Sequence, residues 1–103
     1  MRLVFAEPAA GDLNSILDYI ALDNRAAAET VYRSIVTSAE RLTQIPEMGR
    51  AGRWPKTREL PVPSTPYIIV YEVGPDAVTI LAVFHGARDL ARALAERRAE
   101  LRS

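Results

Sequence analysis

The segment Val78–Phe84, which reads Val-Thr-Ile-Leu-Ala-Val-Phe, constrains the fold of this chain more than any other feature. Six of its seven residues are apolar, and such a run is typical of a strand that is covered on both faces of its sheet. Polar residues follow abruptly, in the order His-Gly-Ala-Arg-Asp over residues 85–89. We therefore expect a buried strand whose end presents a candidate functional site on a rigid support.

Two consecutive amphipathic helices are predicted in the first half of the chain. A short strand over residues 2–6 ends at Glu7-Pro8, and proline suits the first turn of a helix. Apolar residues recur at helical spacing over residues 9–22 and again over residues 25–44. The break at Asp23-Asn24 offers a capping side chain, and so short a link predicts an antiparallel hairpin. The expected buried stripes are Leu13, Ile16, Leu17 and Ile20 in the first helix, and Ala28, Val31, Tyr32, Ile35, Ala39 and Leu42 in the second.

Three more strands are predicted after the hairpin. An irregular loop over residues 47–55 leads into a strand over residues 57–62, which Pro61 and Pro63 place near an edge of the sheet. Residues 66–73 are rich in β-branched and aromatic side chains, as in a strand. The turn Gly74-Pro75-Asp76 then returns the chain as the strand over residues 77–84. These three strands form an antiparallel meander.

A short helix is predicted at the end of the chain, over residues 89–101. Asp89 suits its N-cap, and its apolar anchors are sparse (Leu90, Leu94 and Leu101), so we expect light docking. A helical hairpin must bury its apolar stripe against another layer, and the meander with the N-terminal strand provides that sheet. We therefore expect a single α+β domain over residues 1–103.

The composition narrows the function classes. The 13 basic and 13 acidic residues are unevenly placed: residues 1–49 hold four basic and seven acidic ones, and residues 50–103 hold nine and six. The lack of cysteine excludes disulfides and thiolate metal sites. No apolar run approaches the roughly 20 residues that span a bilayer, and Leu3–Phe5 is too short for a signal-peptide core. We expect a cytoplasmic protein with no cofactor, no metal and no membrane contact.

His85 and Arg88 are the candidate chemical groups at the end of the buried strand. Histidine titrates near neutrality and so suits acid–base catalysis, but a lone histidine at a strand end is more often a structural residue. Arg88 could reach a phosphate or a carboxylate, or pair with Asp89 or Glu72. No serine or cysteine adjoins His85 as a nucleophile.

A basic loop with an aromatic residue is the second candidate. It contains Arg50, Arg53, Trp54, Lys56 and Arg58. An aromatic residue among cations is common on nucleic-acid surfaces, but we favour Trp54 as an anchor packed under the loop.

Three residues near this loop have structural predictions of their own. Glu59 could pair with Arg58 or with the loop. Tyr67 and Tyr71 should share one face of their strand, with Tyr71 partly buried.

The chain resembles the RelE/ParE superfamily of bacterial toxins from type II toxin–antitoxin modules. The resemblance rests on the two consecutive helices, on the segment Ile45–Arg50, on Tyr67–Val73 and on the ending Val83–Asp89. The His-Gly-Ala-Arg-Asp ending is most similar to the ParE branch. RelE-like members commonly have an arginine before the Leu-Val-Tyr of the central strand, whereas this chain has Ile68.

This resemblance implies a RelE/ParE-like fold and a toxin that inhibits DNA gyrase by binding, in the context of plasmid stabilisation. A cognate antitoxin with an acidic, amphipathic segment would neutralise it in a hetero-oligomer, and no direct sequence-specific DNA binding is expected. The alternative is a ribosome-dependent mRNA endoribonuclease, with His85, Arg88 and Arg58 as its catalytic residues. A further alternative is a non-toxic, autoregulatory module that binds the antitoxin. The residues expected to bind the target or the antitoxin are Arg50, Arg53, Trp54, Arg58, Tyr71, His85 and Arg88.

Overall fold

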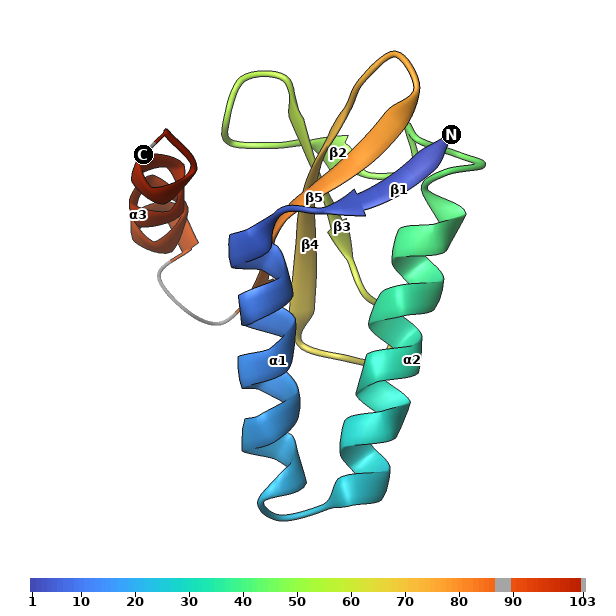
Figure 1. Ribbon diagram of the computed structural model, residues 1–103, viewed down its shortest axis with the longest axis vertical. Helices are drawn as coiled ribbons and strands as arrows, with labels where there is room; N and C mark the ends of the chain where they lie inside the picture. Colours follow the sequence, from blue (N-terminus) through green and yellow to red (C-terminus); the bar gives the residue numbers. More distant parts are fainter. Residues whose placement is uncertain (87–89, 103) are drawn as a thin grey trace.

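A computed structural model describes residues 1–86 and 90–102 of the chain. It has the expected α+β class, with a helical hairpin against one sheet and a helix at the C-terminal end (Figure 1). The elements are β1 (Arg2–Phe5), α1 (Glu7–Ala21), α2 (Arg25–Arg41), β2 (Arg50–Ala51), β3 (Thr57–Pro61), β4 (Tyr67–Val73), β5 (Ala77–His85) and α3 (Leu90–Arg102).

The strands form one sheet in the order β1-β5-β4-β3-β2. β1 is parallel to β5, and the other neighbours are antiparallel. The prediction that Val78–Phe84 is covered on both faces is confirmed. Val78, Ile80 and Val83 belong to one buried cluster, while Ala82 and Phe84 belong to a second.

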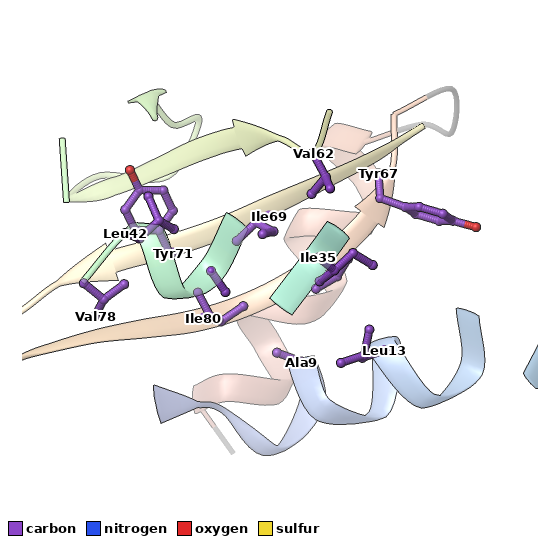
Figure 2. Close-up of a cluster of buried hydrophobic side chains, with 12 residues drawn as sticks. Ala9, Leu13, Ile35, Leu42, Val62, Tyr67, Ile69, Tyr71, Val78 and Ile80 are labelled. Carbon is purple, nitrogen blue, oxygen red and sulfur yellow. The ribbon is translucent and has the colours of Figure 1, made fainter. Parts of the chain in front are cut away.

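The first cluster lies between the sheet and the hairpin, and Figure 2 shows side chains from α1, α2, β4 and β5 meeting there. Asn24 caps α2 as expected, since its side chain accepts the backbone N–H of Ala27 at 3.0 Å. The predicted stripe of α2 is wrong at Tyr32, which is 46% exposed. Tyr32 lies at the margin of the helical face that Ile35 centres, and Ser38 is buried on that face instead.

The segment predicted as an irregular loop contains the two-residue strand β2. Arg50 pairs with Glu59 and Ala51 with Arg58, so the first part of β3 lies inside the sheet. Only the end of β3, which includes Pro61, lies at an edge, where a missing N–H is tolerated.

The second cluster lies on the other face of the sheet and is covered by α3. Leu94 of α3 is 1% exposed and packs with Val70, Ala82 and Phe84. Trp54 of the basic loop packs against the same cluster and is half-buried, as the anchoring interpretation predicted. Of the other predicted anchors of α3, Leu101 is half-buried, and the side chain of Leu90 and the cap Asp89 lie outside the described residues.

Candidate functional site

His85 lies at the end of β5, directly opposite Tyr67 of β4. The two rings meet edge to face, with their centroids 5.6 Å apart. Both side chains line a cleft of about 630 Å³ between α1, β5 and α3, whose lining also includes Ser15 and Tyr19. The ring contact agrees with a structural role for His85 at this corner.

The wall of the cleft contains an ion pair that sequence reasoning missed. The Arg97 guanidinium donates to both carboxylate oxygens of Asp12, at 2.6 Å each, and also to the carbonyl of Leu81 at 3.3 Å. Asp12 accepts the Val83 N–H at 2.9 Å, and the guanidinium lies 5.3 Å from the Phe84 ring centroid. The hydrogen bonds that Arg97 donates to the Asp12 carboxylate raise the pKa of Arg97. This pair joins α1, β5 and α3, so α3 is held more firmly than its sparse apolar anchors suggest.

A signal for this pair was present in the sequence. Asp12 adjoins Leu13 on the inner side of α1, and Arg97 follows Leu94 by three residues, which is almost one helical turn. A charged residue on the inner side of a helix is expected to have a partner of opposite charge, because a buried charge without a partner is costly.

Tyr71 is fully buried, so its prediction as a partly buried binding residue is wrong. Its hydroxyl donates to the carbonyl of Pro46 at 2.8 Å and accepts the Gly49 N–H at 2.9 Å (the ring is drawn in Figure 2). Burial raises the pKa of Tyr71. A Cβ atom at Gly49 would lie 2.6 Å from this hydroxyl oxygen, so only glycine fits there. Tyr71 therefore fixes the loop after α2 and cannot touch a partner. As predicted, Tyr67 shares its face of the sheet.

Arg58 is engaged with the same loop. Its guanidinium donates to the carbonyl of Gly49 at 2.7 Å and to that of Glu47 at 3.4 Å. Arg58 pairs with Tyr71 across β3 and β4, whereas His85 pairs with Tyr67, four residues away along β4. Their backbones are therefore about 13 Å apart along the strands and two strands apart across the sheet. The structure does not bring these two candidates together, and Arg88 lies outside the described residues.

The residues of the basic loop contact different parts of the domain. The carboxylate of Glu59, which is 2% exposed, accepts the backbone N–H of Arg53 at 3.0 Å and lies 3.8 Å from the Arg50 guanidinium. Glu59 therefore pairs with the loop and not with Arg58. The side chains of Arg53 and Trp54 line a groove beside α3 together with Arg98 and Arg102, which sequence reasoning did not single out.

Residues 1–86 and 90–102 contain neither a cluster of metal-ligating side chains nor a membrane-spanning helix. No group of three His, Cys, Asp or Glu side chains in this part of the chain could hold a metal ion. Within the same ranges, none of the helices has the length and apolar content needed to cross a bilayer.

Comparison with known families matches residues 3–90 to the ParE toxin of the type II toxin–antitoxin system parDE. The chain belongs to this ParE toxin family. Among curated relatives, Y4kP of Sinorhizobium fredii is 42% identical over 73 residues, which are 71% of this chain and 75% of that protein. Toxin RelE2 of Caulobacter vibrioides is 33% identical over 87 residues, covering 84% and 97% of the two chains.

Solved structures show the same fold in both branches of the superfamily. A chain of the chromosomal ParDE system of P. aeruginosa matches this ParE-family chain with a TM-score of 0.75 and 27% identity, covering 82% of this chain and 95% of its own. A mutant of the E. coli toxin RelE in the free state matches with a TM-score of 0.66 and 19% identity, covering 94% and 95%. The expected RelE/ParE-like fold and membership of the toxin superfamily are confirmed.

Proposed function

We propose that this ParE-family toxin inhibits DNA gyrase by binding it, and that a cognate antitoxin neutralises the toxin in the cytoplasm. The observation that carries the proposal is the separation of Arg58 from His85 by the register of β3, β4 and β5. The endoribonuclease hypothesis requires Arg58 and His85 to act together, and the sheet holds these two residues apart.

Cleavage of RNA by its 2′-hydroxyl needs a base, a cation at the phosphate and a donor to the leaving oxygen, all within about 3 Å of the reacting atoms. The strand register separates Arg58 from His85, and the Arg58 guanidinium binds the carbonyls of Glu47 and Gly49, so both observations disfavour a role for Arg58 at a phosphate bound by His85. Inhibition by binding requires only a shaped and chemically matched surface, which suits a chain whose Arg58 is held in structural contacts away from His85.

The outer face of the helical hairpin supports an antitoxin-binding role. Leu22 and Tyr32 are 82% and 46% exposed, and Tyr32 lines a groove of about 510 Å³ between α1 and α2. The apolar residues along this groove are Leu17, Ala21, Ala28 and Tyr32. An amphipathic helix or an extended segment of the antitoxin would cover such a face.

Supercoiling and RNA cleavage assays on the same purified chain test the proposal. We expect the chain to inhibit supercoiling of relaxed plasmid by DNA gyrase and to leave translated mRNA intact in primer extension. Expression alone should arrest growth, and co-expression of the small protein encoded beside it should restore growth. Cleavage of translated mRNA with gyrase unaffected would overturn the proposal in favour of the endoribonuclease. Harmless expression with neither activity would overturn it in favour of a non-toxic antitoxin-binding module.

A further inference from the structure

A groove of about 420 Å³ lies between α3 and the loop that joins β2 to β3. We call it the Trp54 groove and define it by Trp54, Leu94, Arg53, Arg98 and Arg102. Leu94 is buried and Trp54 half-buried, so they form an apolar floor, while the three arginines are exposed and form the rim. A neighbouring hollow shares Trp54, Arg98 and Arg102 and extends the surface along the end of α3.

The rim arginines are available for a ligand. Within residues 1–86 and 90–102, none of the three rim guanidinium groups makes an ion pair or a hydrogen bond. Arg50 and Arg58, by contrast, are engaged with Glu59 and Gly49. A guanidinium presents five donors in a planar fork that matches a carboxylate, so three of them around one groove favour an acidic ligand.

The groove is built on both sides before any ligand arrives. On the loop side, the Thr57 hydroxyl donates to the Trp54 carbonyl at 2.8 Å, and the Gly52 N–H donates to the Thr57 carbonyl at 2.8 Å. The buried Glu59 carboxylate also holds the Arg53 backbone. On the helix side, the Asp12–Arg97 pair sets the rotation of α3. A preformed groove lowers the entropy lost on binding.

α3 separates its charges between two surfaces. Glu96 and Glu100 line the cleft that α3 forms with α1, whereas Arg98 and Arg102, one turn apart, line the Trp54 groove. The whole chain has a formal net charge of zero. A nucleic-acid surface normally has a wide basic stripe, so a short groove with an apolar floor and three arginines fits a peptide better.

We propose that the Trp54 groove binds an acidic peptide segment of a partner protein. An apolar side chain of the segment packs on Trp54 and Leu94, and its carboxylates pair with the guanidinium groups at the rim. This inference goes beyond the proposed inhibition of gyrase and does not depend on it, because it concerns only the chemistry of the bound segment.

Fluorescence of Trp54, the only tryptophan in the chain, reports binding directly. The full chain is titrated with a short synthetic glutamate peptide that carries leucine anchors, with the same peptide containing glutamine in place of glutamate, and with oligouridylate. We expect saturable binding of the glutamate peptide that weakens with added salt. The glutamine peptide and oligouridylate should bind far more weakly.

Two double variants with equal charge changes locate the site. R98Q/R102Q should weaken peptide binding about tenfold, because two bidentate contacts are lost. R2Q/R41Q, which neutralises two exposed arginines on β1 and α2 outside both grooves, should leave binding unchanged. Far-UV circular dichroism checks that both variants are folded, and calorimetry repeats the titration without relying on Trp54. Equal weakening by both variants, absence of saturable binding, or tighter binding of oligouridylate than of the glutamate peptide would each overturn the proposal.

Discussion

Replacing Asp12 with Asn should detach α3 from the rest of the domain. The side chains of Asp12 and Arg97 are 14% and 10% exposed and share two contacts of 2.6 Å. Breaking a buried ion pair costs about 3–5 kcal/mol. In the variant Arg97 keeps one carboxylate partner, Glu100, whose Oε2 lies 3.2 Å from the Arg97 Nε, so the cost should fall near the lower end of that range. Because the Asn side-chain oxygen can still accept the Val83 N–H, the loss falls mainly on Arg97.

The loss cannot exceed the free energy that docks α3, since an undocked helix returns Arg97 to water. Burial of Leu94 contributes about 1.5–3 kcal/mol to that docking, and the ion pair contributes the rest. We therefore expect the docking free energy of α3 to fall by about 3 kcal/mol, so that α3 opens locally before the sheet unfolds.

Hydrogen exchange measured segment by segment tests this reasoning. In the D12N variant the amides of α3 should lose their protection, while those of β4 and β5 keep most of theirs. The control variant E96Q breaks the exposed Arg92–Glu96 pair, whose atoms are 3.6 Å apart, and should cost less than about 0.5 kcal/mol. Equal protection of α3 in D12N and E96Q would refute the reasoning.

Three further predictions concern the loop after α2. Tyr71→Phe should lower the free energy of unfolding by about 1–3 kcal/mol in denaturant titrations, because Gly49 N–H and Pro46 C=O lose their partner. Tyr67→Phe should cost little, since within the described ranges the Tyr67 hydroxyl makes no hydrogen bond, and an equal loss would contradict this account. Because burial raises the pKa of Tyr71 above 10.0, the unfolded phenol ionises first, so the wild type should lose stability as pH rises above that value and the Phe variant should lose less. Gly49→Ala should lower the stability by about 1–3 kcal/mol in thermal melts, because the new Cβ would lie 2.6 Å from the Tyr71 hydroxyl oxygen. Gly11→Ala, in open space on α1, should raise the stability by about 1 kcal/mol. Similar shifts of the melting temperature for both variants would contradict the steric argument.

The elements of this fold were largely predictable because their signals are local. The apolar run Val78–Phe84, the cap at Asn24 and the β-branched and aromatic residues of Tyr67–Val73 are all local signals, and each of these elements formed where expected. The strand β2 was missed because two residues carry no periodicity, and its pairing with β3 depends on the turn between them. Tyr32 was misplaced because a stripe read from the sequence does not show which margin of the helix the sheet covers.

The candidate site was much less predictable. Sequence reasoning grouped His85 with Arg58 as nuclease residues, and the strand register then separated them. Tyr71 was a natural candidate for binding until its burial against Gly49 was known. The sequence marked Arg53 and Trp54 as a surface, but the groove needed two arginines of α3 to complete it.

By itself, the sequence determined the order of the helices and of the longer strands, the α+β class and the resemblance to a toxin family, because periodicity, turns and caps operate over a few residues. The tertiary structure alone decided which charges are engaged and which are available. Arg97 meets Asp12 across 85 positions of sequence, Arg58 is held by Gly49, and Arg98 is left exposed beside Trp54. The physical reason is that an ion pair forms only at contact distance, and folding sets those distances between residues that are remote in the chain.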